Sequence, residues 1–196
     1  MKTENHPLKI SQSLIILVTL LGSLTAFSQT FNLNNDNSKL SVFGTSSLHD
    51  WEVVAEKQSG SITVENASET ASISALNFKV IAESLKSGKS GMDKNAYKAL
   101  NTNKFESIDF KLTKINSITP SGSGVYTVKS TGDLTIAGTK NAIQLNFTLT
   151  LTDSKAKLAG SYTFKMTQFK IDPPTAMFGT ITTGDELKIE FNTVFQ

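Results

Sequence analysis

Apolar and polar residues alternate along most of the chain that follows residue 28. The alternation is complete between residues 143 and 152, where every odd position is Ile, Leu or Phe and every even position is Gln, Asn or Thr. Because successive side chains of a strand point to opposite faces, this pattern predicts an antiparallel strand with one buried and one wet face. Further runs occur at residues 40–44, 51–55, 62–64, 76–80, 108–112, 126–136, 158–166 and 187–191. We therefore expect about eight or nine strands.

Residues that favour turns separate the predicted strands. Gly, Pro, Asn, Asp and Ser supply the backbone conformations and local hydrogen bonds that turns need. Such residues cluster at 58–60, 120–124, 137–141, 152–155 and 184–185. Pro173 and Pro174 lack the N–H that a strand ladder requires, so a strand is expected to end near them, with Met177 and Phe178 in the following loop.

One segment departs from the period of two. Met92, Ala96 and Leu100 are spaced by four residues, and Lys94 and Lys98 lie away from them. This spacing predicts a short amphipathic helix over residues 92–100. Because a helix of that length is unstable alone in water, we expect it to dock on an apolar part of the fold.

Strands with one wet face must hide the other face, either between two packed sheets or inside a closed barrel. We favour the barrel, because tight turns would join consecutive strands into a meander and closure would remove the sheet edges. The predicted fold is all-β: an antiparallel barrel of about eight strands with one short helix.

Small residues on the predicted inward faces suggest an internal apolar cavity. Gly132, Gly160 and Ser130 share those faces with Leu, Phe and Tyr residues. An eight-stranded barrel can hold one small ligand where its inward residues are small. The alternative is that neighbouring aromatic side chains fill the space, since protein interiors normally pack densely. The pattern alone leaves both open.

Composition narrows the function classes. All 19 basic residues are Lys and the net charge is +2, so neither a strong positive charge nor Arg side chains support nucleic-acid recognition. The chain has no Cys, which excludes disulfides, thiolate catalysis and metal sites built from Cys.

The first 28 residues have the features of a secretory signal peptide. Two lysines precede the apolar run 14–24, which is shorter than the roughly 20 residues that span a bilayer. Small residues predict cleavage before Gln29, and an uncleaved membrane anchor is the alternative. The expected organisation is a signal peptide at 1–28 and one barrel domain at 29–196, in a bacterial periplasm or secreted.

Few residues suggest catalysis. Ser47, His49 and Asp50 could be proposed as a triad, but adjacent strand positions point to opposite faces, so a relay is disfavoured. The one His of residues 29–196 and scattered carboxylates do not make a metal site. A carboxylate pair for glycoside hydrolysis stays open. Its candidates are Asp50, Glu52, Asp109, Asp133, Asp185 and Glu186.

The predicted binding residues are apolar side chains of the inward faces and of one barrel end. Met and aromatic residues of the helix and of the Pro-containing loop could rim an opening, because such side chains adapt to apolar ligands. Plugging of the barrel end is the alternative. The predicted ligand-binding set is Phe43, Trp51, Phe78, Met92, Tyr97, Leu100, Phe110, Leu134, Phe147, Gly160, Tyr162, Phe164, Met166, Phe169, Met177 and Phe178. No catalytic residue and no metal ligand is predicted.

Several short motifs occur in a specific order. They are SSLHDW at 46–51, LKSG at 85–88, FESIDF at 105–110, GDLTIAG at 132–138 and MTQFKIDPP at 166–174. In this order the chain resembles the YceI-like family of periplasmic lipid- or polyisoprenoid-binding proteins, from about residue 38 to residue 195. Glu106 departs from the family pattern, which commonly has Pro there.

The resemblance implies a lipocalin-like barrel with an apolar tunnel for a long isoprenoid or other amphiphile, and it carries over no catalytic residue. The expected function is non-catalytic: the protein would bind, carry or sequester an isoprenoid or fatty-acid-like lipid, without a cofactor. The alternatives are a secreted structural or stress-related interaction module with a filled barrel, and a hydrolase acting on lipid or glycan. No nucleic-acid partner is expected; transient membrane contact and a homodimer are left open.

Overall fold

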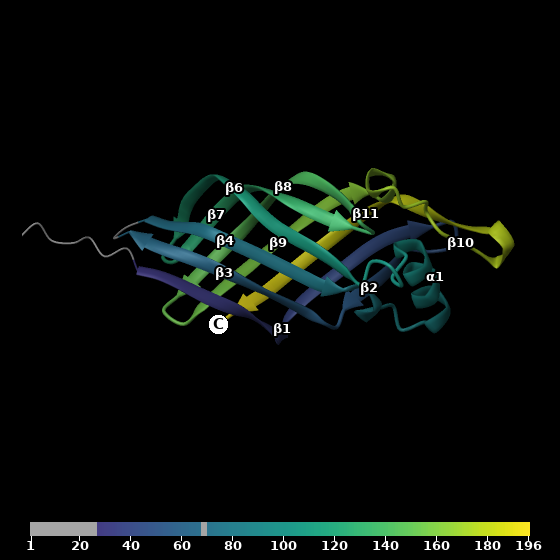
Figure 1. The fold of residues 1–196 in the computed structure, drawn as a ribbon, viewed down its shortest axis with the longest axis horizontal. Helices are drawn as coiled ribbons and strands as arrows, with labels where there is room; N and C mark the ends of the chain where they lie inside the picture. Colours follow the sequence, from purple (N-terminus) through teal and green to yellow (C-terminus); the bar gives the residue numbers. More distant parts are fainter. Residues whose placement is uncertain (1–26, 68–69) are drawn as a thin grey trace, which may run out of the picture.

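The computed structural model describes residues 27–67 and 70–196 (Figure 1). The strands are β1 (Phe27–Ser46), β2 (Trp51–Ala55), β3 (Gln58–Ala67), β4 (Thr70–Ile81), β5 (Leu85–Lys86), β6 (Ser107–Gly122), β7 (Val125–Ile136), β8 (Thr139–Thr152), β9 (Lys155–Lys165), β10 (Thr175–Ala176) and β11 (Ile181–Phe195). The helices are the 3₁₀ turns η2 (Ala82–Ser84), η3 (Met166–Phe169) and η4 (Met177–Gly179) and the α-helix α1 (Ser90–Leu100).

Eight strands form a closed antiparallel barrel. They neighbour one another in the order β11, β9, β8, β7, β6, β4, β3 and β1, and β1 closes the ring by pairing with β11. The sequence prediction of an antiparallel, lipocalin-like barrel of about eight strands with one short helix is therefore confirmed.

The barrel is elongated, and its two ends differ (Figure 1). One end, which we call the open end, carries α1, β10 with η4, and the β1–β2 turn at residues 47–50. The opposite end, which we call the closed end, carries the short β6–β7 and β8–β9 turns. Both ends are built from the same long strands.

A break between β2 and β3 changes the pairing near the open end. β3 pairs with β4 as far as Gln58 and Val80, whereas β2 beyond the break pairs with β5 instead. The side chain of Asn35, from an irregular part of β1, spans the break: it accepts a hydrogen bond from Gln58 N at 2.7 Å and donates one to Glu56 O at 3.0 Å. The wall thus opens between β2 and β4, close to α1.

The helix α1 docks on this part of the wall. Met92 and Leu100 pack against a small apolar cluster, as the spacing of the sequence predicts. The cluster consists of Leu40, Val53, Ala55, Val80 and Leu85. The helix begins at Ser90, two residues earlier than expected, and ends at Leu100; Asn101 caps it with a left-handed φ of 52°.

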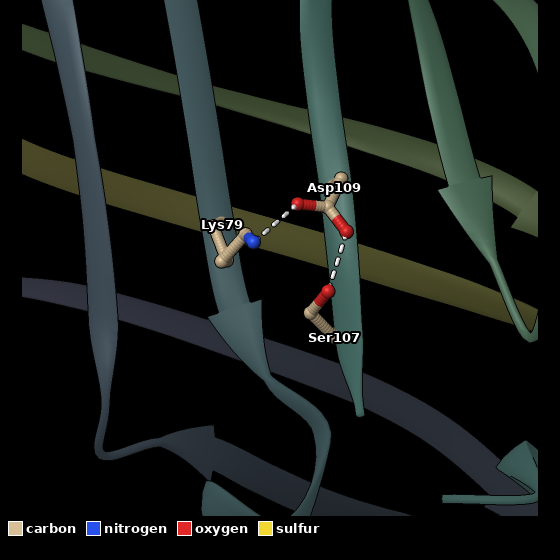
Figure 2. A network of polar contacts seen from close by, with 3 residues as sticks. All are labelled: Lys79, Ser107 and Asp109. Atoms are coloured by element: carbon tan, nitrogen blue, oxygen red, sulfur yellow. Dashed lines mark hydrogen bonds and ion pairs between the residues drawn. The ribbon is translucent and has the colours of Figure 1, made fainter. Parts of the chain in front are cut away.

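The outward faces carry polar side chains. Figure 2 shows one example, in which Asp109 of β6 lies 3.5 Å from Lys79 Nζ of β4 and accepts a hydrogen bond from Ser107 Oγ at 2.6 Å. Lys79 and Asp109 are paired across the two strands. Such exposed ion pairs contribute little to stability, so the barrel depends on its interior.

Two predicted turns and one predicted strand end are wrong. Residues 58–60 begin β3, and residues 184–185 lie inside β11. In both strands the glycine allows a close approach: a Cβ at Gly60 would collide with Asn77 O, and one at Gly184 would collide with Thr45 Oγ1. Met166 begins the 3₁₀ turn η3 instead of ending a strand.

Candidate functional site

An apolar cavity of about 990 Å³ occupies the part of the barrel nearest the open end. Inward side chains of β1, β2, β4, β6–β9 and β11 line it, together with one face of α1. Leu76, Phe147, Leu158 and Phe195 are among its buried lining residues. We call this part of the barrel the cavity half. The volume lies at the upper end of the range of about 300–1,000 Å³ that is typical of small-molecule sites.

The rest of the barrel is filled, and we call it the packed half. Its buried core residues do not line the cavity. They are Phe31, Ile62, Val64, Ala71, Ile73, Val128, Ser130, Leu149 and Ala156. Bulky residues alternate there with Ala and Ser, which is how close-packed interiors interdigitate.

Most of the predicted binding residues line the cavity. The structure brings together Trp51, Phe78, Met92, Leu100, Phe110, Leu134, Phe147, Tyr162, Phe164, Met166, Met177 and Phe178. They come from most of the strands around the ring, from α1 and from the two 3₁₀ turns at the open end. That they bind a ligand remains a prediction.

Three predicted aromatic residues lie outside the cavity. Leu40 and Val42 line it, so Phe43, the next residue after Val42, faces the other side of the wall. Phe169 is buried, and its ring packs edge-to-face against that of Phe164, with centroids 5.2 Å apart. Tyr97 is turned toward β5 and serves as a tether for α1.

The cavity space that the sequence predicts beside the small inward residues is absent. A Cβ at Gly132 would collide with the Phe110 ring, and one at Gly160 would lie 2.7 Å from Phe191 Cζ and 2.9 Å from a backbone oxygen. Ser130 is fully buried and donates to Leu145 O at 2.7 Å. Aromatic side chains therefore fill these places, and Gly160 is not a lining residue. The cavity arises elsewhere along the same strands.

Sequence analysis missed several lining residues. Leu145, Leu187, Ile189 and Phe191 all line the cavity and are only partly buried, because they border empty space. Their places in the alternating runs put them on an inward face. The alternation carries no signal that distinguishes an inward residue beside a cavity from one in a filled core.

The cavity contains few polar groups. Tyr162 stacks beside Phe164 with ring centroids 5.7 Å apart, and burial raises the pKa of its phenol. The remaining polar side chains include His49, Lys89 and Lys94, which belong to the open-end elements. Among the described residues no Asp or Glu lines the cavity.

Ser47, His49 and Asp50 do not form a catalytic triad. His49 Nδ1 lies 2.7 Å from the backbone oxygen of Asp50, and Ser47 Oγ accepts a hydrogen bond from Thr182 N at 3.1 Å. Trp51 lines the cavity, and its indole N–H donates to Thr45 O at 3.0 Å. The segment 46–51 therefore shapes the β1–β2 turn.

None of the candidate carboxylates lines the cavity. Glu52 and Asp133 form ion pairs with Lys39 at 3.4 Å and with Lys140 at 3.3 Å. Asp109 forms the outer-face pair described above (Figure 2). In residues 27–67 and 70–196 no cluster of His, Asp and Glu that could hold a metal ion occurs. Within the same ranges, no helix has the length and apolar character needed to cross a membrane.

Polar contacts hold the elements of the open end. The Tyr97 hydroxyl donates a hydrogen bond to Glu83 O at 2.8 Å and accepts one from Lys86 Nζ at 2.6 Å. The hydrogen bond between Lys86 and Tyr97 raises the pKa of Lys86. Burial alone would raise the pKa of Asp93, but hydrogen bonds from the Ser87 hydroxyl and N–H, at 2.6 and 2.8 Å, lower it overall.

A second carboxylate joins β11 to η3. Asp185 accepts hydrogen bonds from the hydroxyl and the N–H of Thr167, at 2.7 and 2.9 Å. These bonds lower the pKa of Asp185. Asp93 and Asp185 therefore act as structural anchors of the open end.

Comparison with solved structures identifies the same fold. Burkholderia cenocepacia BcnA is 18% identical, with a TM-score of 0.64 over 83% of this chain and 98% of that chain. A polyisoprenoid binding domain from Saccharophagus degradans, described as implicated in plant cell wall breakdown, is 9% identical, with a TM-score of 0.64 over 85% and 97%. A Campylobacter jejuni YCEI protein is 18% identical, with a TM-score of 0.54 over 72% and 82%. At these identities the likeness shows the fold alone.

The family is established from the sequence as well. No curated protein matches the chain. The sequence model of the YceI-like domain family matches residues 31–195, which include every barrel strand except the first few residues of β1. The chain therefore belongs to the family of proteins with a YceI-like domain.

Proposed function

We propose that this protein binds a long-chain amphiphilic lipid of isoprenoid or fatty-acid type in its cavity, and carries or sequesters it without catalysis. The observation that carries the proposal is the apolar cavity of about 990 Å³. Burial of a hydrocarbon contributes roughly 25 cal/mol for each Å² of apolar surface removed from water, so affinity needs no charge pairing. Family membership and the description of one structural neighbour as polyisoprenoid-binding support this ligand class.

A non-catalytic role is the interpretation that the chemistry of the cavity favours. The candidate carboxylates lie outside it, and the segment 46–51 places its hydroxyl and imidazole groups in turn contacts. The filled-barrel alternative is disfavoured by the cavity itself. A hydrolase would need reactive groups beside the ligand, and the described lining offers chiefly apolar side chains.

Native mass spectrometry with organic extraction tests the proposal directly. The protein purified from its own organism is expected to carry a discrete isoprenoid or fatty-acid-like mass. A clean ligand-free mass, with no uptake of added geranylgeraniol or palmitate, would overturn the proposal.

A matched pair of variants locates the ligand. Leu145→Trp adds bulk at the edge of the empty space and is expected to remove most of the cargo while the barrel stays folded. Gln144→Trp places the same ring on the exposed outer face of the same strand, and should leave the cargo unchanged. Equal loading of the two folded variants would show that the ligand binds elsewhere.

The cellular location is a further part of the proposal. We infer export to a bacterial periplasm or beyond, supported by the signal-peptide pattern of residues 1–28. Residues 1–26 lie outside the described residues, and β1 begins at Phe27. Cleavage before Gln29 would keep the β1–β3 pairs from Gln29 to Asn32. The intact mass of the mature protein tests the cleavage point.

A further inference from the structure

Exposed apolar side chains gather where the cavity opens. The described chain exposes four large apolar residues, and three of them, Leu48, Met177 and Phe178, line the opening. Their exposed fractions are 66%, 68% and 109%. Isolated exposed apolar residues are ordinary on protein surfaces, but a group at the mouth of an apolar cavity indicates an interaction site.

The two loops that carry these residues are joined. Ser47 N donates to Thr182 O at 2.9 Å, and Thr182 N donates to Ser47 Oγ at 3.1 Å, which links the β1–β2 turn to the start of β11. Within the second loop, Thr180 Oγ1 donates to Met177 O at 2.7 Å. The apolar group is therefore presented on a hydrogen-bonded support.

The backbone holds the aromatic tip outward. Met177 and Phe178 have φ values of 50° and 57°, in the left-handed region that side chains with a Cβ seldom adopt. Figure 1 shows this loop at the extreme of the long axis of the molecule, beyond β10. A narrow protruding tip suits insertion into a soft surface better than pairing with a rigid, flat partner.

The charged side chains that line the opening itself are basic. Lys89 and Lys94, at the start of α1, line it together with His49, and no described carboxylate does. Asp50, Glu52 and Glu56 line a neighbouring groove beside α1, which shares Lys89 and His49 with the opening. Lys94 lines the opening alone. Lysines beside an apolar tip are the combination that binds anionic membrane surfaces.

We propose that the open end docks on an anionic lipid bilayer, with Phe178, Met177 and Leu48 entering the interface and Lys89 and Lys94 contacting lipid phosphates. The cavity then opens onto the membrane, and a lipid can exchange without crossing water. Docking itself needs no cargo; only the exchange step rests on the proposed function.

Vesicle co-sedimentation tests the docking. We expect binding to phosphatidylglycerol–phosphatidylcholine vesicles, weaker binding to pure phosphatidylcholine vesicles, and loss of the difference at high salt.

Met177→Ser with Phe178→Ser should reduce affinity for the vesicles about tenfold or more. Lys89→Gln or Lys94→Gln should each cost about fivefold on anionic vesicles only. Ile81→Ser, the fourth exposed apolar residue and not a lining residue, is the matched control and should bind as the unmodified protein does.

Three outcomes would overturn the docking proposal. The first is no binding to anionic vesicles. The second is that the variant with Met177→Ser and Phe178→Ser, shown to be folded by circular dichroism, binds as tightly as the unmodified protein. The third is concentration-dependent self-association that Phe178→Ser abolishes, which would make the tip an interface between copies of the chain. Native mass spectrometry of the same preparation separates the proposals: cargo without vesicle binding contradicts docking alone, and vesicle binding without any cargo contradicts the carrier function alone.

Discussion

The packed half and the cavity half are made from the same strands, yet only one of them is filled. On β8, Leu149 is fully buried among the core residues of the packed half, whereas Leu145 on the same face borders the cavity. The strand pairing explains the difference. In the packed half β3 pairs directly with β4, but beyond Gln58 the wall diverges, because β2 pairs with β5.

The comparison separates stability from binding. Residues of the packed half contact neighbours on all sides, which gives them the full transfer and dispersion terms. Residues beside the cavity gain less hydrophobic and dispersion stabilisation, until a bound ligand supplies the missing contacts. The packed half can therefore hold the ring closed while the cavity half remains available to a ligand.

Leucine truncation in the two halves should give the largest contrast. Leu149→Ala is expected to lower the free energy of unfolding by about 3 kcal/mol, because it leaves a hole in a close-packed core. Leu145→Ala should cost about 1 kcal/mol, since that side chain already borders empty space. Urea unfolding of ligand-free protein measures both. Equal losses would mean that the cavity is not empty in solution.

Adding one methyl group to the wall should have an intermediate effect. The Cβ of Gly160→Ala would lie 2.7 Å from Phe191 Cζ and 2.9 Å from Asn146 O. We expect a loss of about 1–2 kcal/mol in urea unfolding, because overpacking shifts both groups. Phe191 lines the cavity, so its displacement should also reduce the amount of extracted lipid. Wild-type stability would show that the wall adjusts freely at this point.

The alternating pattern predicted the ring but not its filling. Leu145 and Leu149 are equivalent in the sequence, and only the diverging strands near Asn35 give them different surroundings. That divergence depends on side-chain hydrogen bonds between residues far apart in the chain, which no local pattern reports. For the same reason the Asn-rich first part of β1 was not predicted as a strand.

Errors in the predicted site have a common physical origin. The small residue at Gly160 predicts room for a ligand, but a neighbouring strand places Phe191 over it. Phe43 is in the predicted binding set, although the positions of Leu40 and Val42 predict the inward face correctly and place Phe43 on the other face. The aromatic ring of Tyr97 predicts a place at the opening, whereas hydrogen bonds from its hydroxyl to Glu83 O and Leu85 O fix its position. The alternation of inward and outward positions along a strand therefore predicts the lining residues better than the type of side chain does.

Acid should loosen the cavity half before the packed half. The pKa of Asp93 is lowered below its usual 3.8 in the folded protein, so its contribution to stability is complete above that pH. As the pH falls through the folded value, the carboxylate is protonated and its hydrogen bonds with Ser87 weaken. Amide hydrogen exchange should show α1 losing protection first. Asp93→Asn should weaken α1 by about 1 kcal/mol at neutral pH and remove this pH dependence; protection lost first in β7 and β8 would contradict the prediction.

Removing the one phenol that lines the cavity should have the smallest effect. Tyr162 Oη makes no hydrogen bond to the described residues, and burial raises its pKa, so the group stays neutral at any pH below its usual 10.0. We expect Tyr162→Phe to change the affinity for a hydrocarbon ligand such as squalene by less than about twofold, because no polar contact is lost. Titration of both proteins across neutral and mildly alkaline pH would give parallel curves. A tenfold loss specific to ligands with a carbonyl or hydroxyl group would instead show that a polar headgroup reaches β9, far inside the opening that Phe178 and Met177 define.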